Sequence, residues 1–271
     1  MPSGKKSKQA RRIAATPPPI QSKGGPRRRQ ANPRVLALGG GVALLAIIGI
    51  VLGIVLSGGG NGTSLKDIPS TGSVANGLPG ASDVQAQYKG IPQEGLSLGS
   101  AKAPVTLVEY IDLQCPFCQQ FETQVMPNIL TKYVRTNKVK VEMRPLGFLG
   151  PDSVSSRKAL LAAAEQNRAF NFAEILYYNQ GTENTGWLND TMIAQAAASI
   201  PGMKVHELLN ARSAGSIADQ AKTFDNQALA DKVSGTPTLY VGKTGTKGKL
   251  VRLSSATDQQ ALVDSISAAL P

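Results

Sequence analysis

The sequence predicts an α/β domain that carries a helical insertion and is preceded by one transmembrane helix. Three observations support this class. An uncharged apolar segment lies near the N-terminus, a strand ends just before a Cys-x-x-Cys motif, and a block of helices separates a β-α-β half from a β-β-α half. Strands that alternate with helices are typical of α/β domains. The helices of the block are too short and separate to form a domain of their own.

The N-terminal tail, residues 1–34, carries the basic character of the chain. It contains ten Lys and Arg residues and no acid, whereas the whole chain has 29 basic and 18 acidic residues. The remaining residues are therefore almost balanced in charge. Such a tail could bind nucleic acid, but an uncharged apolar segment follows it at once, which favours a tail that flanks a membrane span over a nucleic-acid-binding one.

Residues 35–56 form an apolar segment without a charged side chain. A helix of this length spans about 33 Å, which is enough for the hydrocarbon core of a bilayer. Basic residues beside a span stay on the cytoplasmic side. The sequence thus predicts a single-pass cell-membrane protein with a cytoplasmic N-terminus and an extracytoplasmic folded domain.

A cleaved secretory signal is the alternative for this segment. Signal peptides have a shorter apolar region and an A-x-A-like cleavage site, and Val55-Leu56-Ser57-Gly58 matches such a site poorly. We therefore favour an uncleaved anchor, although either interpretation exports the rest of the chain. Residues 57–81 are rich in Gly, Ser, Asn and Pro and predict a flexible linker with a reach of roughly 25–30 Å.

The folded domain is expected over residues 82–271. Residues 105–111 are apolar on both alternating faces and predict a buried central strand. A helix should follow over residues 116–134, with Phe117, Phe121, Val125, Ile129 and Tyr133 along its buried face and a kink at Pro127. The remaining elements are predicted from periodicity. They are a strand at 139–143, helices at 156–168, 170–178, 190–199, 204–210 and 217–232 within the insertion at about 152–232, strands at 238–241 and 249–253, and a helix at 256–270.

The only two cysteines are Cys115 and Cys118. A disulfide that closes a two-residue gap constrains the chain very little, so a structural role is a poor explanation. A zinc site usually needs four ligands. The chain has one histidine, His206, so such a site would need carboxylates or a second chain. A Cys-x-x-Cys motif between a strand and a helix favours redox chemistry.

The expected position of the motif predicts how the two thiols differ. A helix N-terminus exposes unpaired N–H groups and carries positive potential, which lowers the pKa of a thiol there. Pro116 suits the first helical position because no N–H is needed there. We predict that Cys115 forms the mixed disulfide with a client and that Cys118, one turn further along, resolves it.

Two motifs resemble those of a known family. The segment Glu109-Tyr110-x-Asp112-x-x-Cys115-Pro116-x-Cys118 resembles the active-site strand and helix of DsbA-like proteins of the thioredoxin superfamily. Gly235-Thr236-Pro237-Thr238 resembles their cis-proline loop, and the block of helices between the motifs matches their helical insertion. The resemblance covers roughly residues 90–271.

The resemblance implies a thioredoxin fold, with no metal and no dissociable cofactor beyond the redox-active pair itself. It implies a cis bond before Pro237, beside Cys115, with Thr236 and Pro237 binding the client. It also implies a quinone-linked membrane protein that reoxidises the pair, either DsbB-like or vitamin-K-epoxide-reductase-like.

Phe117 departs from the best-known strong oxidants of the family, which have His at this position. Phenylalanine cannot stabilise the thiolate electrostatically. Each pKa unit lost at Cys115 is worth about 1.4 kcal/mol, or about 30 mV for a two-electron couple. We therefore expect a milder oxidant. Thr236 occupies a position that varies in the family, which leaves partner choice and electron direction open.

Glu109 lies on the same strand face as Val105, Leu107 and Ile111. A buried carboxylate has a raised pKa, and the superfamily often has a buried acid six residues before the first cysteine. Glu109 is therefore a candidate proton acceptor for Cys118. The alternative is an acid at a strand end that reaches water.

Three functions fit these observations. The first is an oxidase that introduces disulfides into exported proteins, which we favour. The second is a tethered thiol reductase that supplies electrons to an exported client, and the third is a binding module with an idle thiol pair. The linker does not resemble a dimerisation domain, so we expect a monomer.

Overall fold

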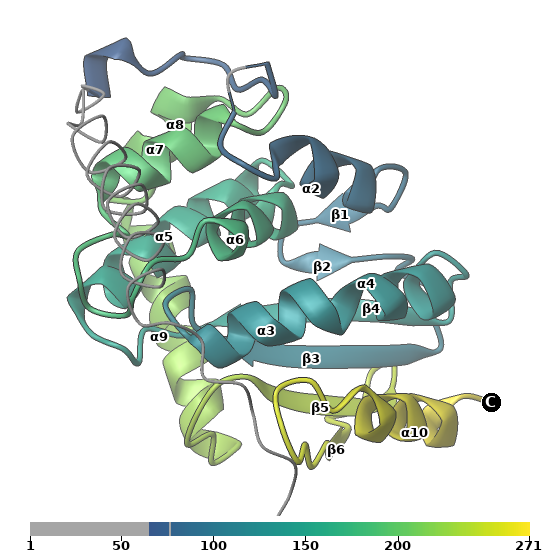
Figure 1. Ribbon diagram of the computed structural model, residues 1–271. Helices are drawn as coiled ribbons and strands as arrows, with labels where there is room; N and C mark the ends of the chain where they lie inside the picture. The colour runs from purple at the N-terminus through teal and green to yellow at the C-terminus, as the bar shows by residue number, and fades with distance from the viewer. Residues whose placement is uncertain (1–64, 76) are drawn as a thin grey trace, which may run out of the picture. The chain divides into compact units, whose positions relative to one another are not determined.

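A completely buried strand, β3 (Val105–Ile111), lies at the centre of a six-stranded sheet (Figure 1). The computed structural model describes residues 65–75 and 77–271. The strand order is β1-β2-β4-β3-β5-β6. Both faces of β3 are covered by helices, which explains why its side chains are apolar in both alternating positions.

The neighbours of β3 produce the predicted arrangement of two halves. β4 (Val139–Pro145) runs parallel to β3 and completes the β-α-β half. β5 (Thr238–Lys243) runs antiparallel to β3 and pairs with β6 (Lys249–Leu250). The predicted α/β class is therefore confirmed.

The far edge of the sheet was not predicted. There a small hairpin, β1 (Gln93–Glu94) and β2 (Ser97–Leu98), pairs antiparallel with β4. Each strand has only two residues, which is too short for a period-two pattern to be visible.

The helix after β3 is interrupted, as Pro127 predicts. It consists of α3 (Pro116–Gln124), α4 (Met126–Ile129) and a π-helical turn (Leu130–Val134). A proline has no N–H to continue the hydrogen-bond ladder. The predicted buried face was wrong at its first position, because Phe117 is 58% exposed. The buried face of α3 contains Cys118, Phe121 and Glu122 instead.

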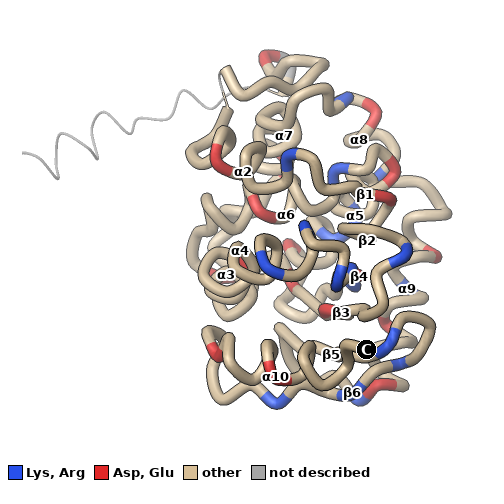
Figure 2. Tube along the Cα trace, turned by 90° about the vertical axis from the view of Figure 1, so that its right-hand side faces the viewer, with Lys and Arg blue, Asp and Glu red and all other residues tan. Residues whose placement is uncertain are grey.

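The helical insertion lies between β4 and β5. It contains α5 (Pro151–Glu165), α6 (Ala169–Tyr178), α7 (Asp190–Ala198), α8 (Val205–Ala211) and α9 (Gly215–Ala230). The chain then ends with α10 (Gln259–Ala269). Figure 2 shows α3 and α10 on one side of the sheet and α9 on the other. The core thus consists of the sheet between these layers, with α6 packed on α3.

The segment before the sheet differs from the predicted linker over residues 57–81. Residues 57–64 and 76 lie outside the described part, but residues 65–75 are attached to the insertion. A 3₁₀ turn (Leu65–Asp67) precedes the buried Ile68, and the N–H of Gly72 donates to the carbonyl of Met203 over 2.8 Å. A Cβ atom on Gly72 would collide with the carbonyl oxygen of Ile200. Helix α2 (Ala81–Tyr88) then leads into the hairpin.

The predicted basic tail (residues 1–34) and membrane span (residues 35–56) both lie outside the described residues. Among the residues that are described, no helix combines the length and the hydrophobicity that crossing a bilayer requires.

Candidate active site

Cys115 and Cys118 lie where the central strand gives way to α3. Cys115 is the residue that caps the N-terminus of the helix, with an extended backbone, and Pro116 occupies the first turn. Cys115 retains 5% exposure, whereas Cys118 is fully buried one turn into the helix. Only Cys115 can therefore be approached from the surface without a rearrangement of the helix.

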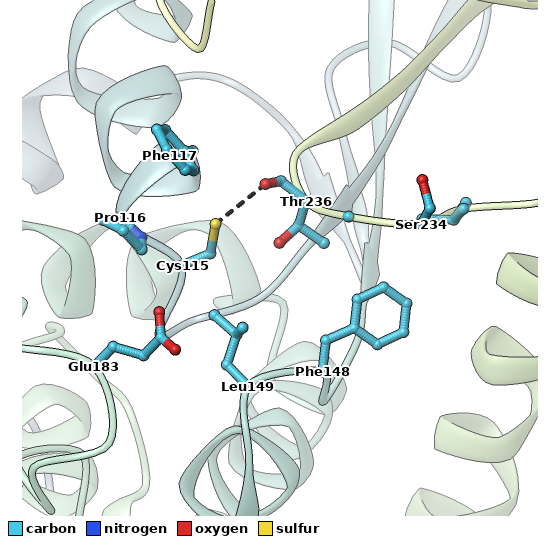
Figure 3. Close-up of a pocket in the computed structure, with 10 residues that line it drawn as sticks. Cys115, Pro116, Phe117, Phe148, Leu149, Glu183, Ser234 and Thr236 are labelled. Carbon is cyan, nitrogen blue, oxygen red and sulfur yellow. Dashed lines mark hydrogen bonds between the residues drawn. The ribbon is translucent and has the colours of Figure 1, made fainter.

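The loop before β5 lies directly against Cys115. The Thr236–Pro237 bond is cis, as the sequence predicted. The Sγ atom of Cys115 donates a hydrogen bond to the carbonyl oxygen of Thr236 over 3.1 Å (Figure 3). Residues 121 positions apart in the chain thus meet at one site. This happens because β5 is the antiparallel neighbour of β3.

The two thiols have opposite pKa shifts. The pKa of Cys115 falls to about 6, mainly because the thiol of Cys118 donates to it, with further support from the side chain of Thr236 and the N–H groups of Cys118 and Phe117. Burial opposes this shift but does not cancel it. Burial raises the pKa of the Cys118 thiol, and its hydrogen bond to Cys115 raises it further. The geometry therefore provides one reactive thiolate and one shielded thiol.

We expect the reduced protein to be alkylated at Cys115 with an apparent pKa near 6. The thiolate is the nucleophile, so the rate should rise with pH through 6 and level off near neutrality. In Cys118→Ala the main donor is lost, and the midpoint should move up toward the ordinary thiol value of about 8.5. Iodoacetamide kinetics between pH 4 and 9 measure both midpoints. A wild-type midpoint above pH 8 would show that the helix start does not activate Cys115.

Glu109 is completely buried, which excludes the alternative of an acid at a strand end that reaches water. Desolvation raises its pKa to about 8. Glu122 of α3 and Glu174 of α6 are also buried, and burial raises the pKa of each. Among the described residues, neither carboxylate oxygen of Glu109 has a hydrogen-bond partner, and the charge of Glu109 raises the pKa of Glu122 further, so both groups favour the protonated form. The site therefore contains a proton-bearing cluster of three buried carboxyl groups.

The sequence pattern did not identify Glu122 and Glu174 as part of this cluster. Glu122 lies four residues after Cys118, so it occupies the same helix face one turn further along. A buried face defined from Cys118, and not from Phe117, would therefore have included Glu122 at the next step of four residues.

Asp112 connects the cysteine loop to the start of the helical insertion. Its Oδ1 atom accepts from the N–H of Gln114 and the hydroxyl of Ser153, at 2.9 and 2.7 Å. Its Oδ2 atom accepts from the N–H groups of Phe148 and Leu149, at 2.8 and 3.1 Å. Asp112 was part of the recognised motif, but no role had been assigned to it. Here it fixes the position of the loop that carries Phe148 relative to Cys115.

A pocket opens above Cys115, between the start of α3, the cis-proline loop and the insertion (Figure 3). Its floor and walls are mostly apolar, and two exposed aromatic rings, Phe117 and Phe148, line it. The lining residues that the sequence did not predict come from loops without periodicity. They are Phe148, Leu149, Glu183, Val233 and Ser234.

Arg144 and His206 do not line the pocket. Arg144 donates to the hydroxyl of Tyr110 over 2.7 Å and lies 3.5 Å from the carboxylate of Asp231. His206 is an exposed residue of α8. Within residues 65–75 and 77–271, no three His, Cys, Asp or Glu side chains are arranged to hold a metal ion.

Comparison with known proteins also indicates a thioredoxin-type domain. Residues 92–261 match the thioredoxin family model. Probable disulfide bond formation protein D of Bacillus cereus is 25% identical over 167 residues, which cover 60% of this chain and 77% of that protein. Disulfide bond formation protein D of Bacillus subtilis is 28% identical over 162 residues, which cover 58% and 70%. Among solved structures, oxidised BdbD of B. subtilis has a TM-score of 0.58 at 22% identity and covers 74% of this chain and 98% of its own.

Proposed function

The chain belongs to the thioredoxin family and is a thiol-disulfide oxidoreductase, and from this premise we propose that it introduces disulfides into exported proteins. The observation that supports this direction most strongly is the pKa of about 6 at Cys115. A stabilised thiolate favours the reduced form of the pair, which makes its disulfide oxidising.

The exchange runs in two steps. A client thiolate attacks the Sγ atom of Cys115 in the oxidised pair, which forms a mixed disulfide and releases Cys118 as a thiolate. A second client thiolate then attacks the client sulfur of that mixed disulfide, and Cys115 leaves as a thiolate. The client loses two electrons and two thiol protons, and the pair gains the two electrons. The low pKa of Cys115 makes it a good leaving group in the second step.

Cys118 needs a proton when it is released, because burial disfavours its thiolate. In our proposal Glu109 supplies this proton, and it takes the proton back when the pair is reoxidised. Its pKa of about 8 keeps it protonated at neutral pH. An acid with a pKa near the working pH is suited to both directions of transfer.

The cis-proline loop is the proposed binding site for the client backbone. Thr236 and Pro237 lie just before the first residue of β5, with the carbonyl of Thr236 beside Cys115. An extended client segment that runs along this loop would place its own sulfur against Cys115. Backbone pairing of this kind is independent of sequence, which suits an enzyme with many clients.

The proposal includes a location and a source of oxidising equivalents. The domain would work outside the cytoplasm, where disulfides persist, as a monomer tethered by residues 35–56. A quinone-linked membrane protein, DsbB-like or vitamin-K-epoxide-reductase-like, would accept the two electrons and restore the disulfide, so that no dissociable cofactor is needed. Protease added to spheroplasts should remove the domain and spare residues 1–34, and release of the domain into the medium would contradict the anchor.

The direction can be tested with the purified full-length protein. After stoichiometric oxidation, it should restore activity to a reduced, unfolded enzyme that needs disulfides, and Cys115→Ser should restore none. Phe117→His should speed the reaction, because an imidazolium would stabilise the Cys115 thiolate further. A wild-type protein that reduces the refolded enzyme instead would favour the reductase.

A further inference from the structure

Glu183 is the one carboxylate among the residues that line the pocket above Cys115. Apart from Cys115, the other lining residues carry no ionisable side chain. They are Pro116, Phe117, Phe148, Leu149, Val233, Ser234, Gly235 and Thr236. Figure 3 shows Glu183 on the side of Cys115 opposite the Thr236 loop. A client that enters this pocket therefore meets two aromatic rings and a single negative charge.

The loop that carries Glu183 is fixed to the active site on both sides. On one side, the Gln180 amide donates to the carbonyl of Leu113 over 3.0 Å and to that of Cys115 over 3.4 Å. On the other, the N–H of Asn184 donates to the side-chain oxygen of Gln114 over 3.0 Å. Three consecutive residues before the helix thus hold the loop, so the position of Glu183 is coupled to that of Cys115.

Glu183 has no cationic partner within the described part of the protein. Its carboxylate accepts from the amide of Asn184 over 3.2 Å, and none of the salt bridges in residues 65–75 and 77–271 includes it. It is also exposed. The charge is therefore available to a bound molecule and is not neutralised by the fold.

We infer that Glu183 determines client specificity: the pocket selects segments in which a Lys or Arg lies close to the reacting cysteine, next to an apolar side chain that packs on Phe117 or Phe148. This inference rests on the proposed function and specifies its substrate class. The charges are complementary, because the Glu183 carboxylate attracts a cation also in the oxidised protein, where Cys115 is part of the disulfide and carries no charge. Complementary charge acts on specificity and association rate more than on affinity.

The test uses two dithiol peptides that contain one aromatic residue and differ only in Lys or Glu beside the first cysteine. Rates of exchange with the full-length oxidised protein are followed by acid quench and alkylation. The informative quantity is the ratio of the Lys-peptide rate to the Glu-peptide rate. Any change in the intrinsic reactivity of Cys115 affects both peptides equally and cancels from this ratio.

Wild type should prefer the Lys peptide. Glu183→Gln should reduce the ratio about threefold, as expected for a partly exposed ion pair, and Glu183→Lys should invert the preference. High salt should shrink the wild-type ratio, because exposed charges are screened. Glu165→Gln, which removes an exposed acid at the end of α5, should leave the ratio unchanged.

A ratio that is the same in wild type, Glu183→Gln and Glu183→Lys would overturn the inference. The ratio is also measured in the reverse direction, with reduced protein and oxidised peptides, because exchange is reversible. A protein that proves to be a reductase would contradict the proposed direction but would still give a ratio. Failure of the specificity inference is thus distinguishable from failure of the proposed function.

Discussion

Replacing Cys118 with Ala should trap client proteins on Cys115 as mixed disulfides, because the Cys115 thiolate can still attack a client disulfide, which bonds one client sulfur to Cys115 and releases the other as a thiolate. In wild type, Cys118 attacks the mixed disulfide and releases a client that cannot complete the exchange itself. Without this intramolecular attack, release depends on external thiols and slows by orders of magnitude, because a neighbouring thiol acts at a very high effective concentration. Non-reducing gels of cells that express the variant should show ladders that collapse on reduction.

The matched variant is Cys115→Ala, which should trap nothing. Cys118 is fully buried and its thiol has a raised pKa, so a client sulfur cannot reach it and it forms little thiolate. The double variant should behave like Cys115→Ala. Complexes that accumulate on Cys118 in the Cys115→Ala protein would reverse our assignment of the attacking and resolving thiols.

Replacing Asp112 with Ala should cost about 3 kcal/mol or more in the free energy of unfolding. The change leaves four donors without their acceptor, three of them backbone N–H groups beside the active site. Each buried donor that loses its partner costs about 1–3 kcal/mol, although entry of water into the space of the carboxylate would offset part of the sum. For a domain of this size, the melting temperature should fall by roughly 6–12 °C.

The controls for Asp112 separate a lost acceptor from a lost charge. Asp112→Asn keeps one acceptor oxygen and should destabilise less than Asp112→Ala. Asp264→Asn, at an exposed position of α10, should change the stability by less than about 0.5 kcal/mol. Calorimetry or urea unfolding of the oxidised proteins gives the values. A loss below 1 kcal/mol in Asp112→Ala would show that the loop carrying Phe148 is held by other contacts.

The parts of the fold that the sequence predicts well have strong local patterns. The buried strand β3 has seven residues, most of them apolar or aromatic. Pro127 interrupts the helix that follows β3, because proline has no N–H to donate to the helix hydrogen bonds. The cysteine pair and the Thr236–Pro237 loop could be identified before the structure because their motifs are short and their order is informative. The contact between the Sγ atom of Cys115 and the carbonyl oxygen of Thr236, at 3.1 Å, depends on the pairing of β3 with β5. From the sequence alone, this contact could only be expected.

The features that sequence patterns missed depend on contacts between distant segments. Residues 65–75 look like a linker because the backbone hydrogen bonds that attach the segment are made to the distant region around Met203, which no local pattern shows. Glu183 lies in a loop with no periodicity, which is held beside the pocket by the Gln180 side chain and by the backbone N–H of Asn184. The burial of Phe117 was wrongly predicted, because steps of four along a helix do not show which of two adjacent stripes faces the core.

The redox state of Cys115 and Cys118 in growing cells tests the central claim most directly. Cells would be quenched in acid, their free thiols would be alkylated with a reagent that adds mass, and the full-length protein would be resolved by gel. An oxidase that is recharged by a membrane partner should carry the pair mostly as a disulfide, which the reagent leaves unmodified. If the pair is mostly dithiol, so that both cysteines are alkylated, the protein works as a reductase and the proposed direction is wrong.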